Sequence, residues 1–326
     1  MSLVNLTILD IGHGNSTLIH SEKGVVLIDA AIGASVQDIL AEKNVTDIDN
    51  IIISHADLDH IGGAIALLLD DSLTIKEVHL NTDALKGTKV WGDFLTALSI
   101  ARKEKGTKVT ASITKDTDNL SFEDFELEVL SPSPIDCLTG PGSQAFGGAR
   151  LDANSMSVVL RLLHKDEKVA LIAGDMDSKS LDFLKSEADC LKAKILIFPH
   201  HGGLPKGSNP KEFSKELCDL VLPELIIFSN SRNKHGNPRK EIIEGITNSS
   251  CSAALACTQM SNECCEEEGL LSSDHLIPSF PSMGKAKNHS CAGTINFVLD
   301  GDNTDTVTVL ASHVDYISGF ENRKCR

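Results

Sequence analysis

The chain has 326 residues, 41% of them hydrophobic, which is enough apolar surface for one large core or two modest ones. No apolar run approaches the length that spans a bilayer, so the composition argues against a membrane protein. The formal net charge of -16 argues against a protein that gathers nucleic acid by its overall field, although bound divalent cations can reverse that charge locally.

The N-terminal sequence and the cysteine count bear on the cellular compartment. Residues 1–7 lack the basic and apolar regions of a secretory signal. The nine cysteines are an odd number, which favours reduced thiols over a disulfide framework. We therefore expect a cytoplasmic protein without a membrane association, and the sequence identifies no partner protein.

Apolar strand patterns alternate with helix patterns along most of the chain, which is typical of a layered α/β fold. Residues 131–153, rich in Pro, Gly and Ser, are expected to form a loop over the site. Helices are expected over 34–44, after Gly63, over about 90–105 and over 178–186. Strands are expected over 3–10, 17–20, 25–29, 51–53, 75–80, 108–114, 125–131, 158–162, 169–174, 194–198, 224–229, 252–257, 293–299 and 306–311.

The most informative stretch follows the strand over 51–53. It places His55, Asp57, Asp59 and His60 within six residues, on a loop between a strand and a helix. Imidazole and carboxylate together are ligands for a divalent cation, and four of them exceed what one ion with an open position requires. A paired-metal site is indicated. The alternative is a solvated polar loop in which His55 caps the following helix.

Three later strands also end in polar residues. Asp175 ends the strand over 169–174, and His200 and His201 follow the strand over 194–198. His235 follows the strand over 224–229 and, taken alone, would be interpreted as a surface histidine. Asn154 precedes another strand and could equally cap a loop. Ligand-type residues at several strand ends favour one shared site.

These motifs resemble the metallo-β-lactamase superfamily, in particular ComEC/Rec2-like hydrolases without the membrane channel. The segment from His55 to His60 is similar to the signature His-x-His-x-Asp-His, with Asp57 at the second histidine. Residues 10–16 resemble the family's Asp-x-Gly-x-Gly-x-Ser opening. Residues 199–203 and 233–238 resemble its Pro-His-His-Gly and Asn-x-x-His-x-Pro segments.

The resemblance implies a role for each residue. His55, Asp57 and Asn154 would bind a first metal, Asp59, His60 and either His200 or His201 a second, and Asp175 would bridge them. His13, Asn154 and His235 would contact the substrate, and Asp10 and Asp29 would orient the ligands from behind. The residues expected to act in catalysis are Asp59, Asp175, His201 and His235.

The implied cofactors are two divalent ions, Mn²⁺ or Zn²⁺, with Mg²⁺ also compatible. Oxygen ligands at Asp57 and Asn154 make the first site harder and suit it to phosphate oxygens. We therefore expect a metal-dependent phosphodiesterase or nuclease acting on nucleic acid. The alternatives are a phosphodiesterase of a small nucleotide or phosphorylcholine-type substrate, a carboxylic ester or lactone hydrolase, and a non-catalytic metal-binding regulatory subunit.

The implied fold is a four-layer αββα sandwich forming one domain over 1–326. Its motifs lie within 10–235, and strands within 251–326 complete the second half. Cys257, Cys264 and Cys291, with Cys265 or His289, could hold a structural zinc, but their spacing matches no tight template, and reduced core thiols are the favoured interpretation.

Overall fold

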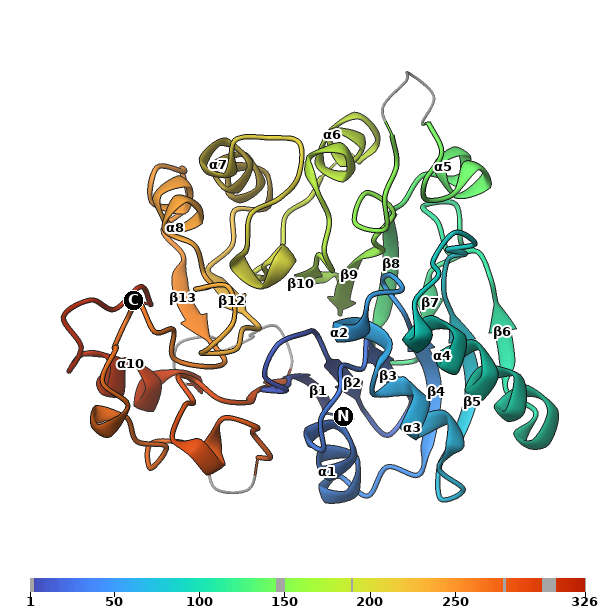
Figure 1. The fold of residues 1–326 in the computed structure, drawn as a ribbon, viewed down its shortest axis with the longest axis horizontal. Coiled ribbons are helices and arrows are strands. Elements are labelled where there is room, and N and C mark those ends of the chain that lie inside the picture. Colours follow the sequence, from blue (N-terminus) through green and yellow to red (C-terminus); the bar gives the residue numbers. More distant parts are fainter. Residues whose placement is uncertain (1–2, 145–149, 189, 278–279, 301–308, 326) are drawn as a thin grey trace.

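The computed structural model describes residues 3–144, 150–188, 190–277, 280–300 and 309–325. Two seven-stranded sheets stack face to face, and helices cover both outer faces (Figure 1). The strand orders are β14-β1-β2-β3-β4-β5-β6 and β13-β12-β11-β10-β9-β8-β7. This arrangement is the αββα sandwich that the sequence predicts.

The first sheet is antiparallel across β14, β1, β2 and β3, and parallel from β3 to β6. Its strands are Val4–Ile8 (β1), Thr17–His20 (β2), Val25–Ile28 (β3), Asp47–Ile52 (β4), Thr74–His79 (β5), Lys108–Thr110 (β6) and Ile295–Leu299 (β14). The helices that accompany it are Ser35–Glu42 (α1), Leu58–Ile61 (α2), Ala64–Leu69 (α3) and Lys89–Ile100 (α4), the last continued by a π-helical turn over Ala101–Lys105.

The second sheet is parallel from β10 to β13 and antiparallel from β7 to β10. Its strands are Leu120–Ser121 (β7), Glu126–Ser131 (β8), Val159–His164 (β9), Glu167–Ile172 (β10), Ile195–Ile197 (β11), Leu225–Phe228 (β12) and Ala254–Cys257 (β13). The remaining helices are Pro134–Thr139 (α5), Ser178–Glu187 (α6), Pro210–Val221 (α7), Lys240–Thr247 (α8) and Ala311–Ile317 (α10), with 3₁₀ turns at Pro199–Gly202, Glu268–Leu270 and Lys285–Lys287.

Three apolar clusters separate the four layers. The middle cluster joins the inward faces of both sheets, for example Ile28 of β3 and Ile172 of β10. A second cluster packs α1, α3 and α4 on the first sheet, and a third packs α6, α7 and α8 on the second. Each sheet is therefore buried on both faces, which explains the near-continuous apolar runs of its parallel strands.

Several elements differ from the sequence predictions. Asp59 and His60 lie on the short helix α2 rather than on a loop, and α5 lies within the predicted loop 131–153, of which residues 145–149 are outside the described residues. The prediction of a strand over 306–311 is wrong where it can be compared, because α10 begins at Ala311; residues 306–308 lie outside the described part. Helices α7 and α8 were not predicted.

The C-terminal region adds one strand to the edge of each sheet. β13 pairs with β12, and β14 pairs with β1 across five residues. Among the described residues, no helix is long and apolar enough to cross a membrane.

Candidate metal centre

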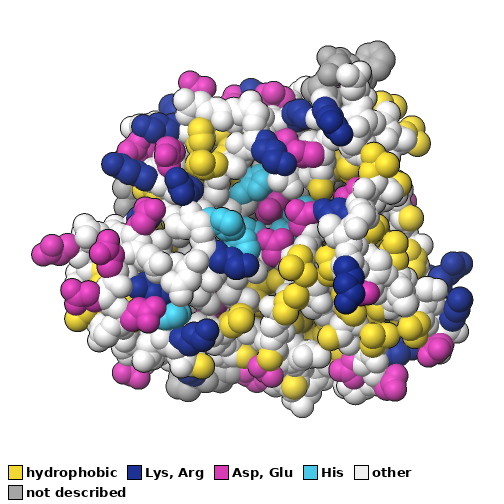
Figure 2. Space-filling view, in the orientation of Figure 1, with side chains coloured by type: hydrophobic (Ala, Val, Ile, Leu, Met, Phe, Trp, Pro, Cys, Tyr) yellow, Lys and Arg dark blue, Asp and Glu magenta, His cyan; other side chains and the backbone are white. Residues whose placement is uncertain are grey.

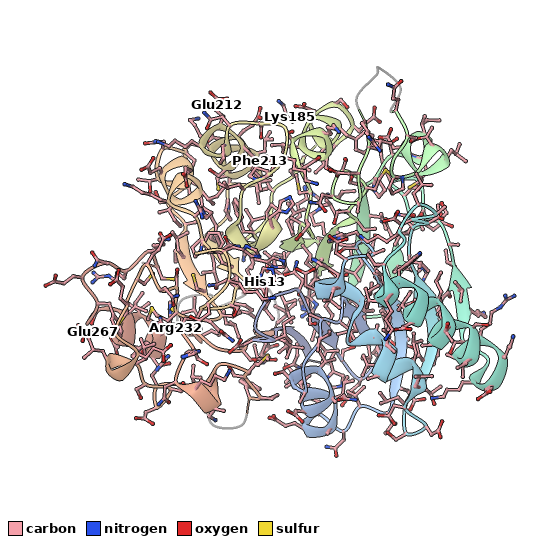
Figure 3. All side chains as sticks on the ribbon, viewed as in Figure 1. His13, Lys185, Glu212, Phe213, Arg232 and Glu267 are labelled. Atoms are coloured by element: carbon pink, nitrogen blue, oxygen red, sulfur yellow. The ribbon has the colours of Figure 1, made fainter. Side chains whose placement is uncertain are left out.

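The polar residues after several strands meet at one edge of the sandwich, between the two sheets. They follow β1, β4, β10, β11 and β12, and histidine and acidic side chains gather at the centre of the face drawn in Figure 2. His13 lies in the middle of this gathering (Figure 3). Because the carboxyl ends of parallel strands share a sheet edge, residues far apart in sequence converge here.

An inner group of ligand-type side chains consists of His55, His60 and Asp175, whose ligand atoms all lie within 4.8 Å of one another. His60 Nε2 is 3.5 Å from Asp175 Oδ1, and His55 Nε2 is 4.0 Å from Asp175 Oδ2. Asp57 Oδ2 lies 3.6 Å from His55 Nε2 at the rim of this group. Two imidazoles and a carboxylate that converge in this way are suitable ligands for a divalent cation.

An outer group consists of His13, Asp59 and His201. Asp59 Oδ2 is 3.3 Å from His13 Nε2 and 3.4 Å from His201 Nε2. Asp175 Oδ1 lies 3.7 Å from the same nitrogen of His201, so this carboxylate adjoins both groups. The geometry offers two neighbouring positions for cations, with Asp175 between them.

The Pro-His-His-Gly segment offers two histidines as candidate metal ligands, and the structure distinguishes them. Both adopt positive φ, 53° at His200 and 55° at His201, and their rings have different partners. His201 joins Asp59 in the outer group. His200 instead places Nδ1 3.4 Å from the second oxygen of Asp175, and its backbone N–H donates to Asp175 Oδ1.

Asp29 lies behind the inner group and orients His60. Asp29 Oδ2 accepts a hydrogen bond from His60 Nδ1 at 2.7 Å, and both of its oxygens accept from Ser54. Burial opposes protonation of His60, but the carboxylates of Asp29 and Asp175 outweigh it and raise the pKa of His60 well above its ordinary value. Without metal the ring holds a proton that a divalent cation would displace.

Several ring nitrogens at this centre lack a hydrogen-bond partner in the part of the chain that the structure describes, and a bound metal ion could take its place. Among the described residues, His55 Nε2, His60 Nε2 and both ring nitrogens of His201 are buried without a hydrogen-bond partner. Buried polar atoms are rarely left unpaired, and a bound cation would satisfy these. Burial also lowers the pKa of His55 to about 3 and that of His13 to about 4, which favours the neutral imidazole that binds metal.

Two predicted ligands lie differently from the rest. The backbone N–H of Asn154 donates to Asp152 Oδ1, and its carbonyl accepts from the backbone N–H of Ser157. Asp57 forms an ion pair with Lys86 through Oδ1. Of the first predicted ligand set, His55 lies in the inner group with Asp57 beside it, and the role of Asn154 as a ligand stays a prediction.

Asp10 contacts the surrounding loops rather than a ligand. Its buried carboxylate accepts hydrogen bonds from Gln259 Nε2 at 2.8 Å and from the backbone N–H groups of Gly12 and Gly284. It thereby joins the loop that carries His13 to the C-terminal region. Asp29 contacts a ligand-type side chain directly, through His60, whereas Asp10 holds the loop of His13 through the backbone N–H of Gly12.

The position of His13 among the ligand-type residues and that of Lys86 at the site are not predicted from the sequence. The glycines that flank His13 are a sequence signal for its position at the site. A Cβ on Gly14, where φ is 133°, would lie 2.3 Å from the carbonyl oxygen of Asp59. The loop approaches α2 closely for this reason. Lys86 comes from an irregular segment between β5 and α4, and nothing in its sequence context points to the site.

Two cavities adjoin the centre and share His13 and Asp59 in their walls. One measures about 390 Å³ and contains His235 and Arg239. The other measures about 440 Å³ and contains Lys234, Lys287 and the exposed apolar residues Ile32, Leu58 and Met283. The ring centroids of His235 and His13 are 5.1 Å apart, so His235 lies beside the outer group.

Comparisons with known proteins show similarity to one family. Residues 9–140 match the family described as the metallo-beta-lactamase superfamily. The chain is 26% identical over 260 residues to ComE operon protein 3 of Bacillus subtilis (strain 168), an alignment that covers 72% of this chain and 30% of that protein. The chain therefore spans less than a third of the length of this curated relative.

Solved structures with a similar fold include the metallo-beta-lactamase fold protein YhfI from Bacillus subtilis, with a TM-score of 0.48, 15% identity, and coverage of 78% of this chain and 96% of that one. Tm1679, described as a metal-dependent hydrolase of the beta-lactamase superfamily, gives a TM-score of 0.47 at 17% identity, covering 78% of this chain and 95% of that one.

Proposed function

The chain belongs to the metallo-β-lactamase superfamily of metal-dependent hydrolases, and from this we propose that it is a phosphodiesterase acting on nucleic acid. One observation carries the proposal: the histidine–carboxylate centre lies between two cavities that both contain cationic side chains. If a phosphodiester of a nucleic-acid strand were bound at the centre, the strand would continue on both sides of it. Each cavity offers positive charge for a flanking phosphate.

We propose that the centre holds two divalent ions, Mn²⁺ or Zn²⁺, with Mg²⁺ also compatible. His55, His60 and Asp175 would hold the first, and His13, Asp59 and His201 the second, with Asp175 shared. When bound, such a pair supplies a water of lowered pKa and positive charge at the attacking and leaving oxygens.

The side chains around the centre would bind and orient the substrate. Arg239 and Lys234 lie in different cavities, so each can pair with a phosphate on its own side of the scissile bond. Leu58, 50% exposed, and Met283, 51% exposed, offer apolar surface to a sugar or base in the second cavity. His235, beside His13, would donate a proton to the leaving oxygen.

The charge distribution reconciles this proposal with the acidic composition. The net charge is -16, but Lys and Arg side chains surround the central histidines and carboxylates on the face drawn in Figure 2. Local charge governs binding at short range, because salt screens distant charges. The overall charge does favour a second candidate, a small nucleotide phosphodiester, over a long polyanion.

The test uses the Mn²⁺-loaded protein with a single-stranded DNA oligonucleotide, an RNA oligonucleotide and a cyclic dinucleotide. We expect cleavage of an oligonucleotide, with KM raised about 10-fold or more in Lys234→Ala and in Arg239→Ala, since a charge-assisted hydrogen bond contributes about 1.5–3 kcal/mol. Lys240→Ala is the control, because that side chain is 80% exposed on α8. Cleavage of the cyclic dinucleotide alone would support the second candidate. Cleavage of no phosphodiester would contradict both.

A further inference from the structure

A second group of metal-binding side chains lies in the C-terminal part of the molecule. Cys291, His313 and Cys325 are all buried, and their ligand atoms lie within 4.8 Å of one another. Cys291 Sγ is 3.2 Å from His313 Nε2 and 4.0 Å from Cys325 Sγ. Figure 1 places α10, which carries His313, and the C-terminus well away from α2, so this group is separate from the candidate metal centre.

Cys257 lies next to this group, as the last residue of β13. Its backbone carbonyl accepts a hydrogen bond from the backbone N–H of Ala292, which holds it beside the segment that carries Cys291. Cys257 is itself buried.

We propose that Cys291, His313 and Cys325 bind one structural zinc ion, and that Cys257, held beside Cys291, completes its coordination. A tetrahedral zinc with Zn–S bonds of about 2.3 Å and Zn–N bonds of about 2.0 Å places sulfur and nitrogen about 3.5 Å apart and two sulfurs about 3.8 Å apart. The observed 3.2 and 4.0 Å are close to these separations. Thiolate ligands select zinc over Mn²⁺ or Mg²⁺, and four protein ligands leave no position for a substrate.

The other residues considered for zinc from the sequence have different partners. Cys264 Sγ accepts a hydrogen bond from the backbone N–H of Lys324 at 3.4 Å, and Cys265 Sγ donates to the carbonyl of Glu267 at 3.3 Å. His289 Nε2 lies 3.4 Å from a carboxylate oxygen of Glu268. The site therefore takes only Cys257 and Cys291 from the sequence-based set, and adds two residues nearer the C-terminus.

Zinc here would fasten α10 and the final residues to the edge of the second sheet. The neighbouring Lys324 donates from Nζ to the carbonyl of Pro238 and pairs with Glu263, both at 2.5 Å. Pro238 follows Asn237, whose side chain donates to the carbonyl of His200. The zinc would thus support, from outside, the segment that carries His235.

The test measures metal content and ligand type, independently of hydrolysis. Protein produced with zinc should retain zinc at this site after mild chelation removes the metal of the catalytic centre. Replacement by Co²⁺ should give sulfur-to-cobalt charge-transfer absorption, which the histidine–carboxylate centre cannot produce. Cys291→Ser should lower the tightly held zinc by one ion per chain and lower Tm, whereas Cys190→Ser, a half-buried thiol outside the group, should change neither.

The cobalt spectrum of the unchanged protein keeps the test decisive if Cys291→Ser does not fold. Absence of thiolate charge transfer would overturn the proposal in favour of reduced core thiols. A disulfide among Cys257, Cys291 and Cys325 in non-reducing mass spectrometry would also overturn it. The readouts are zinc content and absorption. A negative result would therefore not contradict the proposed hydrolase function, and a lack of hydrolase activity would not contradict the zinc site.

Discussion

Replacing Asp29 by Asn tests whether the buried carboxylate orients His60 for metal binding. Asp29 is 1% exposed; its Oδ1 accepts the backbone N–H of Ser54, and its Oδ2 accepts Ser54 Oγ and His60 Nδ1, all at 2.7 Å. An amide keeps the shape but replaces one acceptor by a donor. With its oxygen on the backbone N–H of Ser54, the amide NH₂ faces His60 Nδ1 and favours the tautomer with its proton on Nε2, the nitrogen that points at Asp175.

Two magnitudes follow from this geometry. Loss of a partner that orients a metal-binding histidine lowers metal affinity about 10- to 100-fold, which corresponds to about 1.4–2.7 kcal/mol at 1.36 kcal/mol per decade. Loss of a buried hydrogen bond to a charged group costs about 1.5–3 kcal/mol, so the free energy of unfolding of the metal-free protein should fall by a similar amount.

The assay for Asp29→Asn combines metal titration by calorimetry with urea unfolding after chelation. Asp182→Asn makes the same chemical change at a carboxylate that is 74% exposed on α6, and should leave both quantities unchanged. If Asp29→Asn binds metal as tightly as the unchanged protein, His60 is not oriented by Asp29 and the reasoning fails.

Three further changes test other parts of the centre. Gly14→Ala should lower the free energy of unfolding by about 1–3 kcal/mol, because φ is 133° there and the new Cβ would lie 2.3 Å from the Asp59 carbonyl oxygen; unchanged urea unfolding would contradict the close approach. Burial lowers the pKa of His13 from 6.5 to about 4, so the unfolded chain takes up this proton first and stability falls as pH drops through that window. His13→Asn should flatten this acid limb in chelated protein, and an unchanged slope would count against a buried neutral His13. Lys86→Met should raise metal affinity several-fold in calorimetry, since the ammonium that pairs with Asp57 is gone, and weaker binding would show that Lys86 supports the site instead.

The layered fold, and the gathering of ligand-type residues at one sheet edge, could be predicted from the sequence for one physical reason. Buried parallel strands produce apolar runs, and residues directly after such a run are held at the sheet edge by the strand itself. His55 and Asp175 lie there, just after β4 and β10, and α2, which carries Asp59 and His60, follows soon after His55. Short-range spacing was sufficient because little backbone separates these side chains from the sheet.

Backbone conformation and long-range contacts could not be predicted in this way. His200 and His201 are adjacent and both have positive φ, but the His201 ring faces Asp59 and the His200 ring faces Asp175, a difference that sequence spacing does not contain. Lys86 reaches Asp57 from an irregular segment between β5 and α4. Helix α10 likewise brings His313 to cysteines from separate segments, which matches no compact zinc template.

The central claim is that this centre hydrolyses phosphodiesters with bound metal, and bis(p-nitrophenyl) phosphate tests it most directly. Metal-stripped protein would be given back Mn²⁺, Mg²⁺ or Zn²⁺, with Asp59→Ala measured alongside. We predict turnover that depends on the added ion and disappears in Asp59→Ala, whose carboxylate joins His13 and His201. No turnover with any of the three ions, or equal turnover in Asp59→Ala, would contradict the account.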